Sequence, residues 1–125
     1  ISYAMDVAPF LNEDFKMYSG NDDIIVPMLA LGSSGVISVL ANIVPEETHE
    51  MCERFRKGDV KGAMDLQLKY LDLIHSLFCE VNPIPVKTAM NDMGFQMGDL
   101  RLPLYKMSDK NHERLKESLK KVDLL

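Results

Sequence analysis

Cysteine is scarce in this sequence, and its two cysteines, Cys52 and Cys79, lie far apart without a Cys-x-x-Cys spacing. Such a pair gives little support to a disulfide framework or a zinc knuckle, so we expect reduced thiols and a cytoplasmic location. Positive charge is not in excess either, because 14 Lys and Arg residues stand against 19 Asp and Glu residues. The basic residues are not interleaved with aromatic ones, and nucleic acid is therefore not an expected partner.

Targeting signals are also missing from the start of the chain. The first residues, ISYAMDVAPFLNEDF, contain neither a basic n-region nor a cleavage pattern. There is no initiator methionine, and Ile1 leads directly into the amphipathic pattern of residues 2–11. We interpret the chain as truncated, or as one half of a larger protein. No internal repeat and no low-complexity segment is present.

One long stretch, residues 24–44, lacks any charged side chain. About 20 apolar residues would span a bilayer as a helix, so this length raises the question of a membrane segment. However, Pro27, Gly32 and Gly35 interrupt the stretch, and its centre, GSSG, is typical of a turn. We therefore predict two elements joined by a tight turn, with no membrane span.

The first part of the chain alternates between helical and extended patterns. Helices are predicted over residues 2–11, 22–31 and 46–57, and short strands over residues 15–18 and 36–40. This alternation is the signature of parallel βα units. Two parallel strands cannot close a barrel or cover both of their edges, so other strands must complete this part of the fold.

The second part is predicted to be entirely helical, which divides the chain into residues 1–58 and residues 59–125. Asp59 is followed by a long helical pattern with two apolar faces, which indicates burial between layers or between subunits. Two X-Pro steps then impose extended geometry, a helix follows over residues 86–93, and a last helix begins near Ser108. Overall we expect a mostly helical chain of the α/β class.

The turn Ser19-Gly20-Asn21-Asp22 is the most informative place for a site. It joins the carboxyl end of a predicted strand to a helix, which is where α/β folds place the backbone that binds ligands. The glycine has an equally good structural explanation, because a tight turn alone can require it. The spacing of the residues does not decide between the two.

No complete catalytic set is visible from residue types alone. Lys16 lies at the start of a strand and Lys87 at the start of a helix, and neither sits in the apolar pattern that would desolvate a nucleophilic amine. His49 and Cys52 are three residues apart on one helix, but two ligands without a third make a poor zinc site. We predict no metal and no cofactor.

Four separated motifs, YSGNDD, LALGSSGVISVLANIVP, NPIPVKTAMNDMG and LRLPL, together resemble the C-terminal part of the dihydrodipicolinate synthase family. The resemblance covers nearly the whole chain, and the motifs occur in the order found in the family. It implies a (β/α)8 TIM barrel followed by a helical domain. Residues 15–18 and 36–40 would then be the last two barrel strands, and residues 59–125 the C-terminal domain.

The same resemblance implies a chemistry. The family condenses pyruvate with aspartate semialdehyde through a Schiff base on a lysine, in lysine and diaminopimelate biosynthesis. That lysine lies on a strand that this chain lacks, so no catalytic residue carries over. Gly20 and Ile37 correspond to the wall of the pyruvate pocket, and Ser19, Asn21 and Asp22 lie at its rim.

Three interpretations remain open at this point: part of an active synthase, a structural half that pairs with another copy or with a separate N-terminal half, and a helical interaction module with a vestigial pocket. The family usually forms homo-oligomers, and uncovered strand edges give an independent reason to expect association. The isolated chain is expected to be inactive, because removing a covalent nucleophile removes the reaction route.

Overall fold

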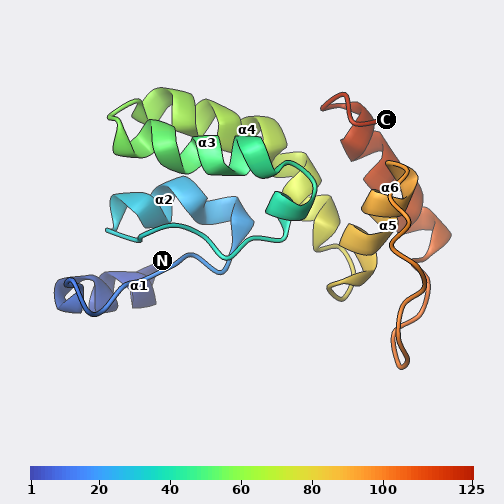
Figure 1. Ribbon diagram of the computed structural model, residues 1–125, viewed down its shortest axis with the longest axis horizontal. Helices are drawn as coiled ribbons and strands as arrows, with labels where there is room; N and C mark the ends of the chain where they lie inside the picture. The colour runs from blue at the N-terminus through green and yellow to red at the C-terminus, as the bar shows by residue number, and fades with distance from the viewer. The chain divides into compact units, whose positions relative to one another are not determined.

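The computed structural model describes residues 1–125 (Figure 1). It is mostly helical, as predicted, and it contains no β-strand. Two compact units are present, Ile1–Leu68 and Lys69–Leu125, and each is described by itself. The division between them lies inside helix α4 (Val60–Leu77), whereas composition places a domain boundary after residue 58; that boundary stays a prediction.

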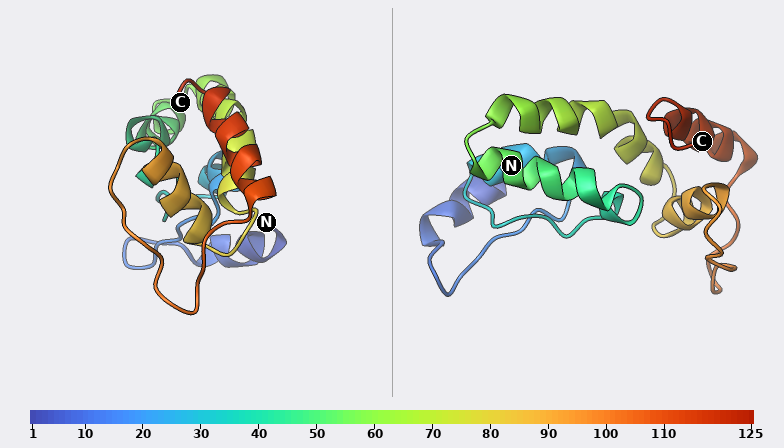
Figure 2. Two further views of the ribbon diagram at one scale, coloured as in Figure 1. Left: turned by 90° about the vertical axis from the view of Figure 1, so that its right-hand side faces the viewer. Right: turned by 45° about the horizontal axis from the view of Figure 1, so that its top comes forward.

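The first unit is built from short helical elements around α2 and α3. The predicted helices over residues 2–11, 22–31 and 46–57 are confirmed. α3 and the first part of α4 run antiparallel and side by side (Figures 1 and 2). The elements that precede α4 are α1 (Ser2–Val7), η1 (Ala8–Phe10), η2 (Asp22–Ile24), α2 (Ile25–Ala30), η3 (Leu40–Asn42) and α3 (Pro45–Arg56).

Local sequence signals set the ends of α3 and α4. Pro45 occupies the first turn of α3 with two acidic residues behind it, an arrangement that suits the positive end of the helix dipole. Gly58 has φ +87°, a left-handed conformation that glycine adopts without strain and that stops the helix. Asp59 then caps α4, because its Oδ1 accepts a hydrogen bond from the Gly62 amide at 2.9 Å.

The two predicted strands, residues 15–18 and 36–40, are wrong as strands. These segments meet only in an isolated parallel bridge between Ser19 and Val36. The Ser19 amide donates to Gly35 O at 2.9 Å. The physical reason is that each segment is paired along one edge only, and the second segment turns into η3 at Leu40. A ladder this short does not form a sheet.

The uncharged stretch of residues 24–44 does divide at its Gly-Ser-Ser-Gly centre, as predicted. Its first half contains α2, whose Ile25, Val26, Met28 and Leu29 are buried in the core of the unit. Its second half contains the bridge segment and η3. None of the helices in the structure combines the length and the apolar character needed to cross a membrane.

The second unit contains the C-terminal part of α4 together with α5 (Ile84–Asp92) and α6 (Asp109–Lys120). α5 and α6 lie side by side, and the chain between them makes a long excursion without regular structure (Figure 2). The last helix begins after Ser108, as predicted, and its apolar side chains Leu115 and Leu119 are buried. The core of the unit consists of Tyr70, Leu73, Ile74, Leu77, Val86, Ala89, Leu115, Leu119 and Val122.

The two predicted apolar faces of α4 differ in how far they are buried. Leu73 and Leu77 on one face have no exposed surface. The other face is covered only in part, because Ala63 and Ile74 are buried whereas Val60 is 49% exposed and Leu68 is 57% exposed.

Candidate functional site

Gly20 and Ile37, the two predicted pocket-wall residues, lie next to each other at the parallel bridge. Each directly follows one of the bridged residues, Ser19 and Val36, and the Ile37 amide donates to Ser19 O at 2.8 Å. Successive side chains of extended backbone point to opposite faces, so Gly20 and Ile37 share the face opposite to the buried Ser19. The Ile37 side chain is 72% exposed. The two residues thus form one open surface.

Nothing in the chain fills the space in front of Gly20. A Cβ atom built at this position would meet no heavy atom within 4 Å, and the φ angle of Gly20 is not in the left-handed region. Neither packing nor backbone conformation within these residues therefore requires a glycine here. A side chain at this position would project into the space beside Ile37.

Ser19 shapes the turn from the inside. Its side chain is 1% exposed, and its Oγ both donates to Asn21 O at 2.8 Å and accepts from the Asn21 amide at 3.3 Å. Such local bonds are the means by which serine stabilises turns. Asn21 itself lies at the surface. The serine hydroxyl is consequently committed to the turn, whereas the asparagine side chain is accessible.

Asp22 is buried rather than exposed, with 1% of its surface accessible. Its Oδ2 accepts hydrogen bonds from two main-chain amides, that of Val39 at 3.0 Å and that of Leu40 at 2.9 Å. These amides begin η3, so the carboxylate occupies the position of a helix cap supplied from a distant segment. The Asp22 clamp, meaning these two bonds, links the turn to the segment that carries Ile37.

Gln67 of α4 is a neighbour of the turn that no sequence motif indicated. It is 2% exposed, its Nε2 donates to Asp22 O at 2.7 Å, and its Oε1 accepts from the Val26 amide at 3.0 Å. Its position does indicate burial, because Gln67 lies on the inner face of α4, one helical turn from the buried Ala63. A buried amide of this kind needs partners, and both of its ends have them.

None of the lysines is buried, and Lys16 is exposed as expected for a residue outside the reaction. The hydrogen bonds that Lys61 and Lys121 donate to Asp65 and Asp72 raise the pKa values of these two lysines above their ordinary value. A Schiff-base lysine needs the opposite shift, which desolvation produces. The chain therefore places no amine that is suited to attack a carbonyl group.

A cavity of about 330 Å³ lies next to the bridge in the first unit. Cys52 lines it and is 6% exposed, and burial raises the pKa of its thiol, which disfavours the reactive thiolate. His49 lies at the same cavity but is exposed. No group of three or more His, Cys, Asp or Glu side chains is arranged to hold a metal ion. This cavity offers neither an activated nucleophile nor a ligand set.

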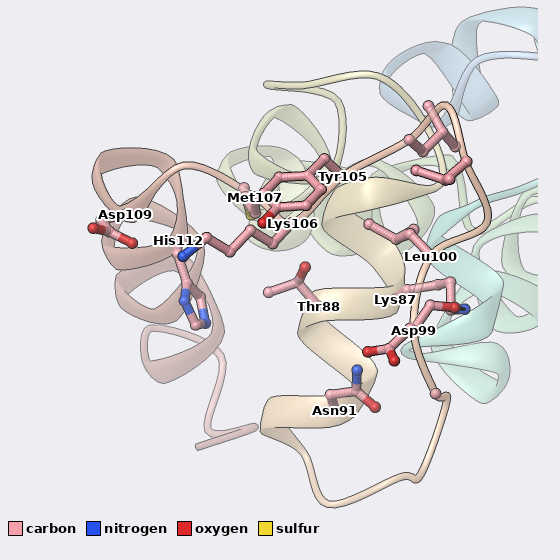
Figure 3. Close-up of a pocket in the computed structure, with 13 residues that line it drawn as sticks. Lys87, Thr88, Asn91, Asp99, Leu100, Tyr105, Lys106, Met107, Asp109 and His112 are labelled. Atoms are coloured by element: carbon pink, nitrogen blue, oxygen red, sulfur yellow. Dashed lines mark hydrogen bonds between the residues drawn. The ribbon is translucent and has the colours of Figure 1, made fainter.

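A larger cavity, of about 630 Å³, lies in the second unit between α5, α6 and the loop before α6, and Figure 3 shows its lining. No motif in the sequence predicts this cavity. His112 Nε2 and Asp92 Oδ2 are 2.7 Å apart, a pairing that can orient an imidazole ring. The nearby Thr88 hydroxyl donates to Ile84 O at 2.8 Å within its own helix. The Thr88 hydroxyl is therefore bonded within α5 rather than to the histidine.

Comparison with known proteins identifies the family of the chain. Residues 1–122 match the model of the family described as the dihydrodipicolinate synthetase family. The chain belongs to this family. The matched residues include the Ser19–Asp22 turn and Ile37, which form the open surface at the bridge, and also the residues that line both cavities.

Relatives within the dihydrodipicolinate synthetase family are similar along the whole chain. The 4-hydroxy-tetrahydrodipicolinate synthase of Clostridium perfringens (strain SM101 / Type A) is 54% identical over 125 residues, which are 100% of this chain and 43% of that protein. The chain thus spans less than half the length of the curated relatives that it matches.

Solved structures of the family give the same picture. The synthase of Cyanidioschyzon merolae, a structure with lysine bound, superimposes with a TM-score of 0.94 at 32% identity, over 99% of this chain and 42% of that one. The synthase of Acinetobacter baumannii, complexed with pyruvate, gives a TM-score of 0.91 at 35% identity, over 100% of this chain and 43% of that one.

Proposed function

We propose that residues 1–125 form the C-terminal portion of a 4-hydroxy-tetrahydrodipicolinate synthase, a lyase of lysine and diaminopimelate biosynthesis. The complete enzyme condenses pyruvate with aspartate semialdehyde through a Schiff base. The observation that carries this proposal is the 54% identity to such a synthase over every residue of the chain. In this proposal the chain supplies the last two βα units of a TIM barrel and a helical domain, and an N-terminal half supplies the rest.

The chain's own share in the reaction is to form part of the pocket wall. Gly20 and Ile37 make this wall, the first by leaving room and the second by presenting an apolar side chain that is 72% exposed. An apolar wall excludes water from one side of a bound keto acid, and it contacts carbon atoms rather than carboxylate oxygens. Ser19, Asn21 and Asp22 stand at the rim, where Ser19 and Asp22 act through the backbone that they hold.

The Schiff-base step itself belongs to a lysine outside these residues. This assignment is supported by the exposure of the lysines in the chain and by the raised pKa values of two of them. We therefore propose that the chain is inactive alone and that its partner in catalysis is the N-terminal half of the barrel.

A graft tests the proposal. Residues 1–125 replace the matching 43% of the Clostridium perfringens synthase, and the condensation of pyruvate with aspartate semialdehyde is followed at steady state. We expect turnover from the graft and none from the relative that lacks this portion, which serves as the control. A graft that folds and binds neither substrate would overturn the proposal.

A second candidate function is a structural half that pairs with another copy or with a separate N-terminal half without taking part in catalysis. The observation that favours it is the large amount of apolar surface in the chain, since Tyr3 is 80% exposed, Phe10 69% and Leu102 86%. The graft separates the two candidates. If the chain is only a structural half, the graft folds and assembles. Its turnover then does not change when residues of the open surface are substituted.

A further inference from the structure

The exposed side chain of Ile37 rests on a backbone that is fixed on both sides. On one side its amide donates to Ser19 O at 2.8 Å. On the other side, two and three residues further on, Val39 and Leu40 donate to Asp22 Oδ2. The next amide, that of Ala41, is held locally by Ser38 Oγ at 2.9 Å. An exposed side chain on an anchored backbone is typical of a preorganised contact surface.

Asp22 is itself anchored to a long helix. Its main-chain oxygen accepts from Gln67 Nε2 at 2.7 Å, and Gln67 Oε1 accepts from the Val26 amide, which ties the same glutamine to α2. The side chains of Asp22, Gln67 and Val26 are all buried. A displacement of Asp22 would therefore be transmitted to Val39 and Leu40, and from there to Ile37, rather than being absorbed by solvent.

The second carboxylate oxygen of Asp22, Oδ1, has no hydrogen-bond partner, although it is buried. Leaving a buried acceptor unpaired costs free energy, and native proteins seldom retain such a group for stability alone. An apolar residue would avoid this cost, but it could not accept the bonds from Val39 and Leu40. A carboxylate at this position thus points to a role beyond packing.

We propose that Asp22 is a positioning residue for the pyruvate pocket, which sets the place of Ile37 opposite Gly20 by holding the main-chain amides of Val39 and Leu40. This inference rests on the proposed function, because it concerns the same wall. Asp22 does not touch the reacting atoms in this account. It acts through the backbone, so its loss changes the fit of the wall to pyruvate more than the rate of the chemical step.

The test compares Asp22→Asn and Asp22→Ala with a matched control, Asp23→Asn. Asp23 is the adjacent carboxylate, it is exposed, and no residue donates a hydrogen bond to it. In the graft we expect both Asp22 variants to raise the KM for pyruvate by about tenfold while kcat changes less, and the control to leave both parameters unchanged. A merely structural role would instead reduce the amount of folded enzyme and leave the KM of the remainder unaltered.

A second readout needs no activity. Hydrogen exchange of the Val39 and Leu40 amides, measured on the 125-residue chain, is expected to become at least about tenfold faster in the Asp22 variants and to stay the same in Asp23→Asn. Unchanged exchange rates of these two amides in the Asp22 variants would show that Asp22 does not hold them. Faster exchange with an unchanged KM in an active graft would overturn the positioning role.

The two proposals fail in different ways. An inactive graft of the unaltered chain contradicts the proposed function, and the exchange measurement then decides alone whether Asp22 holds the segment of Ile37. An active graft whose pyruvate KM ignores Asp22 contradicts only the inference about Asp22.

Discussion

Gln67 holds Asp22 from across the first unit: its Nε2 donates to the main-chain oxygen of Asp22 at 2.7 Å, across 45 positions in the sequence. The opposite end of the same amide group accepts the Val26 amide at 3.0 Å. One buried side chain thus joins α4 to the turn of the candidate site and to α2. It connects the open surface to the core of the unit.

Replacing Gln67 by alanine should therefore destabilise the first unit. The substitution leaves the Val26 amide and the Asp22 carbonyl without partners in a buried place, and we expect the free energy of unfolding to fall by about 2–3 kcal/mol. Gln96→Ala is the matched control, because Gln96 is exposed in the loop after α5. Chemical denaturation followed by circular dichroism measures both variants. Equal stabilities of the two would contradict the role given to Gln67.

Gly20→Ala should leave the stability of the chain within about 0.5 kcal/mol of the unaltered protein, because the added methyl group enters open space. In the graft, the same methyl group should raise the KM for pyruvate, because it takes up room beside Ile37. Thermal unfolding of the chain and steady-state kinetics of the graft give the two readouts.

Gly58→Ala is the contrasting variant for this experiment. Gly58 also has open surroundings, but its φ is +87°, so alanine there should cost about 1 kcal/mol of stability through backbone strain alone. In the graft it should leave the pyruvate KM unchanged. A Gly20→Ala variant that loses stability but retains its KM for pyruvate would show that Gly20 is not part of the pocket wall.

Acid should weaken the second unit through Glu80. Its Oε1 accepts from Ser108 Oγ at 2.6 Å, from Asn111 Nδ2 at 2.7 Å and from the Ser108 amide at 3.1 Å. The Ser108 hydroxyl bond, followed by that of Asn111, lowers the pKa of Glu80 below its ordinary value of 4.5. Because the folded pKa is the lower one, this stabilisation is present above about pH 4.5 and is lost as the pH falls through the folded value.

The variant Glu80→Gln keeps the shape of the side chain and removes its charge. Near neutral pH we expect it to lower the free energy of unfolding by about 0.5–1 kcal/mol, a modest value because the group is partly exposed. The difference from the unaltered protein should vanish in acid. Glu117→Gln, a change at an exposed residue of α6, should show no such pH dependence in thermal melts from neutral to acidic pH. If the difference in the free energy of unfolding persists in acid, the ionised form of Glu80 is not its cause.

The isolated chain should self-associate. Large apolar side chains of the first unit are uncovered, among them Phe10 at 69% and Leu68 at 57% exposure. Sedimentation velocity over a range of concentrations is expected to reveal species larger than the monomer. Leu68→Lys should reduce this association, whereas Gln96→Lys, which adds the same charge elsewhere, should not. A concentration-independent monomer would contradict this expectation.

Helix ends could be predicted from the sequence because their signals are local. Pro45, Gly58 and Asp59 each act within one turn of the helix that they start or stop, so a short window contains the whole cause. Strands differ, because a strand is defined by its partners. The extended segments at residues 15–18 and 36–40 have only each other, and a single bridge results.

The candidate site could be located only in part. The motifs indicated Gly20 and Ile37, and the structure brings these residues together at the bridge. The bonds that hold them could not be predicted, because Asp22 and Val39 are 17 positions apart and Asp22 and Gln67 are 45 apart. Side-chain bonds over such distances follow from the packing of α2 against its neighbours, which no local pattern encodes.

The most direct test of the proposed function is the intact mass of the graft after incubation with pyruvate and borohydride. A lysine amine and the pyruvate carbonyl form an imine with loss of water, and borohydride reduces the imine to a stable secondary amine. We expect one reduced pyruvate per polypeptide, on a lysine outside residues 1–125. A folded graft without an adduct, or an adduct on one of the lysines of residues 1–125, would contradict it.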